Sequence, residues 1–298
     1  MAQELASIQK MLIPVDFSDT SIRAIEHGAF MAKLYKADLV LVHVIEKHFQ
    51  NFSVVASEIQ FTLPSDLVGK IKGKVIELAE KVRQDHGVNT TAITTEGGIC
   101  EEIITIANTE NIDLIVMGTH GVSGLSEMFL GSNAYKVVTL APCPVLTVQS
   151  HAERVGFANI LLPIDSSSHS RQKVVSAIHL AKNYGSSITL LGLLEEGNQS
   201  DADKFKLKLE QTKDFILKEG VPVSLELRLN GNLGKNTIYA ARELKADLIM
   251  IMTDQDENFS ESFLGSYAQQ IVNHSRIPVL SIKPMVKANN LEWGYPYN

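Results

Sequence analysis

The stretch Asp113–Val148, DLIVMGTHGVSGLSEMFLGSNAYKVVTLAPCPVLTV, carries the clearest structural signal in the chain. Residues 113–117 form a short apolar run, which is typical of a strand buried on both faces. Residues 118–131 hold four glycines and predict a loop, whereas residues 132–140 have apolar side chains at helical spacing. Residues 144–148 predict a second buried strand. The stretch therefore predicts a strand, a glycine-rich loop, a helix and a strand.

This order of elements suits a phosphate ligand. The first N–H groups of a helix lack intrahelical partners and carry roughly half a positive charge. Glycines let the backbone approach a ligand closely or adopt positive φ. Ser132 is expected at the N-cap, where its hydroxyl can cap the helix or face a phosphate oxygen. The alternative is an ordinary surface loop followed by a plain N-cap serine.

The chain contains an internal repeat. The segment LIPVDFSDTS from Leu12 aligns without gaps with LLPIDSSSHS from Leu161, at an offset of 149 residues (161 − 12). The later parts, in which DLI, FLGS and PVL recur, align at an offset of 134 residues (247 − 113). The first repeat thus has 15 more residues in its middle (149 − 134). We expect two domains, at residues 1–150 and 151–298.

Each repeat alternates between strand and helix patterns. In the first helix, Ile22, Ile25, Ala29 and Ala32 are expected on one buried face. Such alternation predicts a parallel sheet covered on both faces, with right-handed connections. The expected fold class is α/β, with two tandem doubly wound, Rossmann-like domains of five mostly parallel strands each. The predicted segments of the first repeat are strands at 11–15, 38–44, 90–95, 113–117 and 144–148, and helices at 18–35, 67–86, 98–110 and 132–140.

Composition excludes several classes of protein. The net charge of −7 argues against a nucleic-acid-binding surface. The chain has no apolar run of about 18 residues, so no membrane span is expected, and its N-terminus lacks the apolar core of a signal peptide. Cys100 and Cys143 have no metal-type spacing, which fits a reducing cytoplasm. Both thiols are expected to be inert.

Doubly wound sheets bind ligands at the carboxyl ends of their strands, where the strand order reverses. In the first repeat these ends carry Asp16, His43 with Val44, Glu96, and Gly118. Asp16 and the glycine loop face one crevice only if their strands are neighbours, which the spacing leaves open. Two alternatives stay open as well: Asp16 caps the following helix, and His43 is a satisfied core histidine.

Three familiar motifs are missing from the sequence. There is no GxxxxGK[ST], no GxGxxG after the first strand and no GxSxG. Their absence argues against a P-loop NTPase, a dinucleotide-dependent dehydrogenase and a serine hydrolase, respectively.

The motif Gly118-x-x-Gly121, nine further residues and Gly131-Ser132 resembles the nucleotide-binding signature of the universal stress protein family. The segments 14–18, PVDFS, and 43–45, HVI, also resemble that family, in which tandem chains are known. The resemblance implies an adenine nucleotide alpha hydrolase-like fold and an ATP ligand, with or without Mg²⁺, in the first domain. The binding residues it implies are Pro14, Val15, Asp16, Val44, Met117, Gly118, Gly121, Gly131, Ser132 and Asn133.

The resemblance also implies roles. Asp16 would hold the ribose hydroxyls, Val44 would place the adenine through its backbone, and the helix start at Gly131 would hold the phosphates. The second repeat departs from the motif, because Met252 and Gln255 replace two glycines. Its loop also carries four carboxylates, which would repel phosphate. Our hypothesis is that the second repeat has lost nucleotide binding. The four carboxylates are those of Asp254, Asp256, Glu257 and Glu261.

The function expected is a nucleotide-binding regulatory or stress-response module. A slow ATPase or phosphoryl-transfer enzyme is one alternative, and an interaction scaffold with a vestigial site is another. Phosphoryl transfer usually needs a base, a metal and a cation, but the motif loop contains no lysine or arginine, and His120 and Glu127 are its only candidates. Binding is therefore favoured, with no catalytic residue assigned.

Expected partners follow from the family resemblance. The two domains are expected to pair through their last strands, and a homodimer of chains stays open. The extra segment 47–65 and the aromatic C-terminal tail are candidates for a lid or a partner surface.

Overall fold

The computed structural model describes residues 5–46, 65–119, 131–150, 152, 154–167, 170–194, 199–253 and 264–284. The first repeat contains β1 (Lys10–Pro14), α1 (Asp19–Tyr35), β2 (Asp38–Glu46), α2 (Ser65–His86), β3 (Thr90–Gly97), α3 (Ile99–Thr109), β4 (Leu114–Gly118), α4 (Ser132–Leu140) and β5 (Val145–Val148). The second contains β6 (Asn159–Ile164), α5 (Val174–Tyr184), β7 (Ser187–Leu194), α6 (Gln199–Lys218), β8 (Val223–Leu229), α7 (Leu233–Glu243), β9 (Leu248–Met252), α8 (Ser266–His274) and β10 (Val279–Ile282). The predicted α/β class and the predicted succession of elements are confirmed.

One face of α1 differs from the expectation. Ile25, Ala29 and Ala32 are buried as predicted, but Ile22 is 36% exposed. The buried stripe continues through Ser21 instead, which is 4% exposed. Ser21 lies four residues before Ile25 and Ile22 only three, and both spacings fall near one helix face. The Ser21 hydroxyl donates to the Ser18 carbonyl at 2.9 Å, so its polar atom is satisfied in the buried position.

The strands form one sheet in the order β3-β2-β1-β4-β5-β10-β9-β6-β7-β8. Within each repeat every pairing is parallel. The chain runs outward from β1 through β2 to β3, then returns to add β4 on the other side of β1. Met11 pairs with Leu114 and Leu12 with Ile115, so β1 and β4 are direct neighbours. The strand order therefore reverses between the strand that leads to Asp16 and the strand that leads to the glycine loop.

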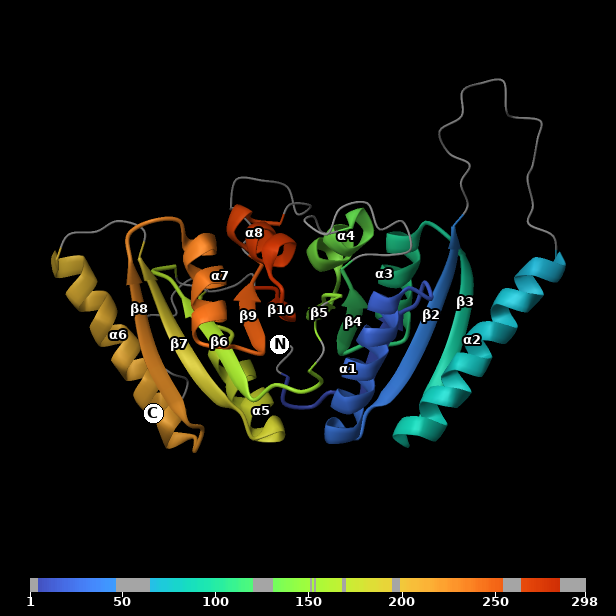
Figure 1. The fold of residues 1–298 in the computed structure, drawn as a ribbon, viewed down its shortest axis with the longest axis horizontal. Helices are drawn as coiled ribbons and strands as arrows, with labels where there is room; N and C mark the ends of the chain where they lie inside the picture. Colours follow the sequence, from blue (N-terminus) through green and yellow to red (C-terminus); the bar gives the residue numbers. More distant parts are fainter. Residues whose placement is uncertain are drawn as a thin grey trace, which may run out of the picture.

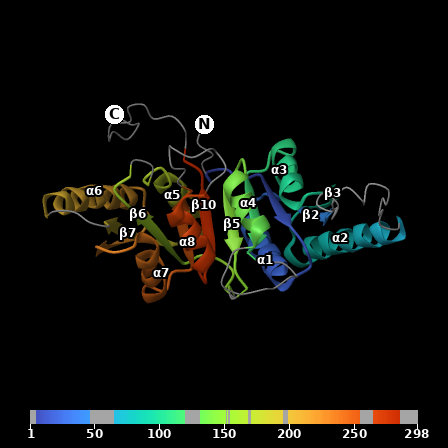
Figure 2. The same ribbon diagram turned by 90° about the horizontal axis from the view of Figure 1, so that it is seen from above.

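The two repeats meet at the centre of the sheet (Figures 1 and 2). There β5 lies antiparallel to β10, with Leu146 opposite Leu280. The Thr147 hydroxyl, which is buried, donates to the Val279 carbonyl at 3.3 Å. The outer ends of the molecule are formed by α2 and α6 with the strands β3 and β8 (Figure 1). The arrangement makes one continuous sheet from two homologous halves.

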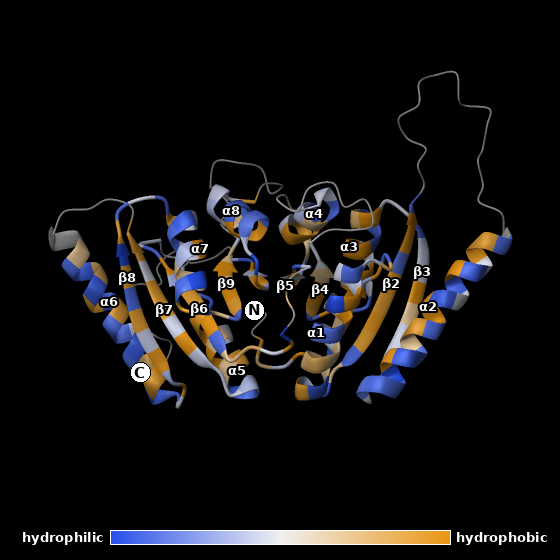
Figure 3. Cartoon of the chain, in the orientation of Figure 1, coloured by the Kyte–Doolittle hydropathy of each residue, from blue (hydrophilic) through white to orange (hydrophobic). Residues whose placement is uncertain are grey.

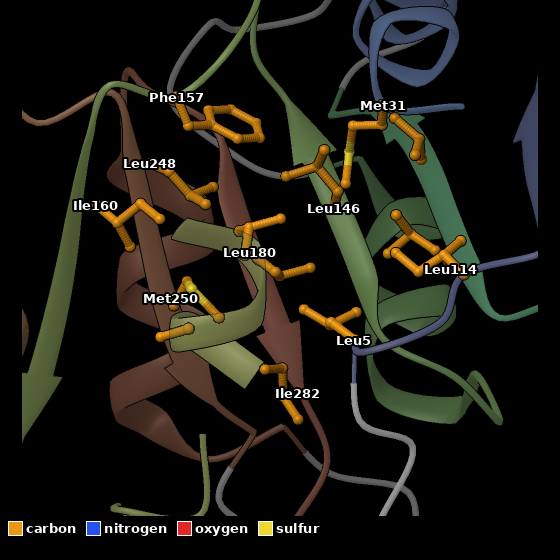
Figure 4. Close-up of a cluster of buried hydrophobic side chains, with 14 of the residues drawn as sticks. Leu5, Met31, Leu114, Leu146, Phe157, Ile160, Leu180, Leu248, Met250 and Ile282 are labelled. Atoms are coloured by element: carbon orange, nitrogen blue, oxygen red, sulfur yellow. The ribbon is translucent and has the colours of Figure 1, made fainter. Parts of the chain in front are cut away.

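Helices cover both faces of the sheet and enclose two cores. One core lies under α1, α2, α5 and α6, and the other under α3, α4, α7 and α8. The first core runs across the junction, because Leu146 and Met31 of the first repeat share it with Leu180 and Met250 of the second (Figure 4). Apolar residues concentrate on the strands, while α2 and α6 carry many hydrophilic residues (Figure 3). Among the helices that the structure describes, none is both long and apolar enough to cross a membrane.

Candidate functional site

The turn after β1 is built around Asp16. Its Oδ1 accepts hydrogen bonds from the Ser18 backbone N–H at 3.0 Å and from the Ser18 hydroxyl at 2.5 Å. Ser18 is the N-cap of α1, and its Oγ accepts from the Ser21 N–H at 3.3 Å. The alternative in which Asp16 itself caps the helix is therefore wrong in detail: Asp16 orients the serine that does. Asp165 repeats this turn by accepting from the Ser167 N–H at 2.9 Å.

The end of β4 is packed tightly against the start of α1. A Cβ added to Gly118 would lie 2.9 Å from the Thr20 Cβ and 3.0 Å from the Thr20 carbonyl carbon. Gly118 does not have positive φ. Its lack of a side chain is therefore explained by the neighbouring helix as well as by any ligand. Met117, by contrast, buries its side chain in the core under α3 and α4.

The start of α4 is tied to β4. Thr119 is buried; its N–H donates to the Val148 carbonyl at 3.0 Å, and its own carbonyl accepts from the Gly131 N–H at 2.9 Å. Gly131 is the N-cap of α4, with φ −56° and ψ 143°, and Ser132 is the first helical residue. The prediction that Ser132 is the N-cap is wrong by one position. Glycine and serine both favour the N-cap. A Cβ on residue 131 would lie 3.1 Å from the Thr119 carbonyl oxygen, and this crowding favours glycine at the N-cap.

The end of β2 completes this edge of the sheet. The Val15 N–H donates to the Val42 carbonyl at 2.8 Å, which joins the turn after β1 to β2. His43 is half-buried, and its Nδ1 lies 2.7 Å from the Val15 carbonyl oxygen. His43 is thus hydrogen-bonded, as the core-histidine alternative expects. Val44 follows on the opposite face of the sheet, next to the core under α3 and α4.

Nine of the ten residues implied by the family resemblance therefore lie at one edge of the first repeat. Pro14 pairs with Val42 in the sheet register, and the strand ends at Asp16, Val44 and Gly118 belong to three adjacent strands. The start of α4 follows directly from β4 through the bond between Gly131 and Thr119. Gly121 and the loop candidates His120 and Glu127 lie outside the described residues. This edge combines a carboxylate, backbone polar groups and the N-terminus of a helix.

The two cysteines are buried and unreactive. Burial raises the pKa of Cys143 to about 12. Burial also raises the pKa of Cys100, and the neighbouring Glu101 carboxylate adds to the effect. Thiols with raised pKa are poor nucleophiles. Among the described residues, no group of three or more His, Cys, Asp or Glu side chains could hold a metal ion, so Mg²⁺ stays a prediction.

Comparison with known proteins identifies this arrangement. The sequence profile of the universal stress protein family matches two segments, residues 7–149 and 156–283, which together cover more than half of the chain.

The chain belongs to the universal stress protein family.

Two similar universal stress proteins each match about half of this chain. The chain is 33% identical over 147 residues to universal stress protein YxiE of Bacillus subtilis, which covers 47% of this chain and 98% of that protein. It is 32% identical over 154 residues to universal stress protein MJ0577 of Methanocaldococcus jannaschii, covering 47% of this chain and 94% of that protein. A universal stress protein structure from Archaeoglobus fulgidus covers 92% of this chain and 98% of its own, with a TM-score of 0.70 at 23% identity. That likeness shows the fold.

The second half of this universal stress protein differs at the edge that corresponds to the site. Met252 stands where Gly118 stands in the first repeat, and its side chain is buried. The helix α5 begins at Val174, whereas the residue aligned with the start of α1 is at position 168 (19 + 149). Residues 170–173 form a turn in place of the first helical turns. Gly118 permits the close approach of the α1 start, and a methionine at the same position would collide with a helix that started as early.

A lysine fills part of the space at this turn. Lys173 aligns with Ala24 and is 3% exposed. Its Nζ donates to the Ser170 carbonyl at 2.5 Å and to the Ser170 Oγ at 3.3 Å. The second repeat of this universal stress protein therefore keeps the aspartate turn and loses the geometry around it.

Sequence reasoning missed Phe17. This residue has φ 63°, its side chain is 41% exposed, and its ring lies 5.2 Å from the His43 ring. The signal was present in the repeat itself, because Phe17 aligns with Ser166 and His43 aligns with Gly192. A difference between two otherwise similar repeats marks a position that the fold alone does not determine.

Proposed function

We propose that this universal stress protein binds an adenine nucleotide, with ATP as the expected ligand, in a first domain at residues 1–150. A second domain at residues 151–298 is proposed as a structural or regulatory half. The observation that carries this proposal is the difference at the ends of β4 and β9. Gly118 leaves room for the start of α1, while Met252 is accompanied by a later helix start and a buried Lys173.

Each part of the nucleotide would contact a different group of the proposed site. The Asp16 carboxylate can accept hydrogen bonds from ribose hydroxyls. The first N–H groups of α4, at Ser132 and Asn133, offer donors and the positive end of a helix dipole to the phosphates. Bonds from N–H groups to phosphate are charge-assisted and therefore strong. Val44 would place the adenine through its backbone. The remaining proposed lining residues are Pro14, Val15, Met117, Gly118, Gly121 and Gly131.

Binding is proposed rather than turnover. Phosphoryl transfer draws on a cation at the transferred phosphate. Residues 113–135, which contain the motif, include no lysine or arginine. We therefore expect the nucleotide to act as a regulatory ligand that changes stability or assembly. Phosphate release from ATP, measured on the same samples, tests the ATPase alternative.

The test uses a charge placed at the helix start. Ser132 is exposed and is the first residue of α4, and Ser266 is its exposed counterpart in α8. Ser132→Asp should repel phosphate while favouring the helix dipole, so folding should be kept. Ser266→Asp is the matched control. ATP at about one hundred times its dissociation constant should stabilise the wild type by roughly 2.7 kcal/mol.

Thermal unfolding with and without ATP, on nucleotide-free protein, separates the outcomes. We expect stabilisation of the wild type and of Ser266→Asp, and none of Ser132→Asp. The opposite pattern would move the site to the second repeat. No stabilisation of the wild type would favour the scaffold alternative. ADP and AMP in parallel samples would rank the nucleotides.

A further inference from the structure

Phe17 adopts the left-handed backbone conformation, with φ 63°, which is unusual for a phenylalanine. Among the described non-glycine residues, positive φ occurs at Phe17, Lys36, Asn111, Asn230 and Lys245. Lys36 is the C-cap of α1, and Asn111 and Lys245 lie just after α3 and α7, where the left-handed conformation is usual. Asn230 precedes α7, and asparagine tolerates this conformation. Phe17 precedes α1 and has no such tolerance. A residue with a side chain is strained there, and such strain is often associated with function.

The turn holds Phe17 in this conformation from both sides. Asp16 accepts two hydrogen bonds from Ser18, one residue beyond Phe17. Ser18 in turn caps α1. The aromatic ring is 41% exposed, so core packing does not account for it. Folding alone would favour glycine or asparagine at this position.

His43 supports the ring from the side of β2. The two ring centroids are 5.2 Å apart and the planes are tilted by 43°. The His43 Nδ1 lies 2.7 Å from the Val15 carbonyl oxygen. A carbonyl only accepts, so Nδ1 carries the hydrogen, and this bond fixes the imidazole plane. Phe17 and His43 therefore form an aromatic pair at the ends of β1 and β2.

The second repeat lacks this pair. Ser166 replaces Phe17 and is not among the residues with positive φ. Gly192 replaces His43, and a Cβ there would collide with Leu209 and lie 2.9 Å from the Leu227 Cδ1. Aliphatic packing thus occupies the place of the imidazole. The aromatic pair and the intact glycine motif occur in the same repeat.

The order of the strands indicates what the pair would contact. The sheet order is β2-β1-β4, and Asp16 follows the middle strand. If Asp16 holds the ribose, the phosphates extend towards β4 and the start of α4. The base, on the other side of the ribose, then extends towards β2, where Phe17 and His43 lie.

We propose that the exposed face of Phe17 stacks on the nucleobase of the bound nucleotide, with His43 acting as a positioning residue for the phenyl ring. This inference rests on the proposed function. It adds a base-stacking platform to the site. Stacking depends on the π-face of a base. Removal of the phenyl ring should therefore weaken the binding of any nucleotide and leave the binding of a base-free ligand unchanged.

Calorimetric titrations of the full chain test the proposal. ATP and ribose 5-triphosphate, which has no base, are the two ligands. Phe17→Gly removes the ring, and glycine adopts φ 63° without strain. The variant should therefore be at least as stable as the wild type. Phe17→Leu keeps an apolar side chain without a π-face. Phe30→Leu is the matched control, because Phe30 is a 39% exposed phenylalanine of α1 whose ring lies 5.6 Å from Tyr184.

We expect both Phe17 variants to bind ATP about tenfold more weakly or worse, with ribose 5-triphosphate binding unchanged. Phe30→Leu should bind both ligands like the wild type. ATP affinity within twofold of the wild type in Phe17→Gly would overturn this inference and leave the proposed function intact. Equal losses for both ligands would also overturn it, because the ring would then act on the turn around Asp16. No ATP binding by the wild type would overturn the proposed function, and this inference with it.

Discussion

Two separate reasons account for a glycine at position 118. The glycine belongs to the motif that resembles a nucleotide site, and it also gives the α1 start room to approach β4. A variant at this position therefore tests packing before it tests binding. Gly131 is similar, since its N–H bonds to the Thr119 carbonyl and a Cβ would crowd that oxygen. Ser132, with an exposed side chain, separates packing from binding better.

Gly118→Ala should lower the free energy of unfolding by about 1–3 kcal/mol, the usual cost of overpacking. The added methyl group would lie 3.0 Å from the Thr20 carbonyl carbon, which belongs to the backbone and cannot rotate away. Urea denaturation measures the change. Gly69→Ala in α2 is the control, because no atom beyond its own turn of helix lies within 4 Å of its added Cβ, and it should be neutral or stabilising. A Gly118→Ala variant as stable as the wild type would contradict this account.

The strands β4 and β9 are anchored at their beginnings by a repeated aspartate. The Asp113 Oδ2 accepts from the Gln9 N–H at 2.7 Å and from the Lys10 N–H at 3.0 Å. The Asp247 Oδ2 accepts from the N–H groups of Ala158 and Asn159 at 3.1 and 3.0 Å. These carboxylates lie at the amino ends of the strands, whereas the proposed site lies at the carboxyl ends. Their recurrence in both repeats has a structural reason.

Asp113→Ala and Asp247→Ala should each destabilise the protein by about 1–3 kcal/mol, because two backbone N–H groups lose an anionic acceptor. The two sites are in different repeats, so the effects should add in the double variant within about 0.5 kcal/mol. Denaturant midpoints with a constant slope measure both quantities. Neither variant should change ATP affinity. A large loss of affinity in Asp113→Ala would assign that residue a role in the site.

The two repeats share one core, and a histidine is buried where they join. His27 of α1 is 1% exposed, and its ring stacks on Phe157 with centroids 5.8 Å apart. Burial lowers the pKa of His27 to about 4, and the Arg23 charge lowers it slightly further, while a hydrogen bond to the Ala152 backbone opposes the shift. Phe157 lies between the repeats and also contacts Tyr184 of α5, at 5.1 Å between ring centroids. Protonation of His27 places a charge in the core where the two halves join, and therefore destabilises the packing there.

Stability should fall as the pH drops from about 6.5 to about 4. In this window the unfolded chain binds a proton at His27 and the folded chain does not, so the unfolded state gains. The full loss is about 3 kcal/mol for a shift of this size. His27→Gln should flatten this part of the stability profile relative to the wild type. Unfolding free energies measured at several pH values give the comparison, and parallel profiles for the two proteins would contradict it.

Local patterns predicted most of the elements. The apolar runs at residues 113–117 and 144–148 became β4 and β5, and the helical spacing at 132–140 became α4. Errors arose where two adjacent residues were candidates for one structural position. Gly131 and not Ser132 is the N-cap of α4, and Ser21 and not Ile22 continues the buried stripe of α1. At the start of α4 the contact between Gly131 and the Thr119 carbonyl, which lies 12 residues earlier (131 − 119), decides for the glycine, and a local sequence window does not show it.

The sequence by itself determined the duplication, the α/β class and the family, because each depends on the order and spacing of residues along the chain. The tertiary structure alone decided that β1 lies beside β4 and that the Phe17 ring lies next to the His43 ring. These contacts join residues far apart in sequence, and their geometry depends on the side chains that fill the space between them. The proposed site belongs to this second group, since its carboxylate, its helix start and its aromatic pair come from three separate segments.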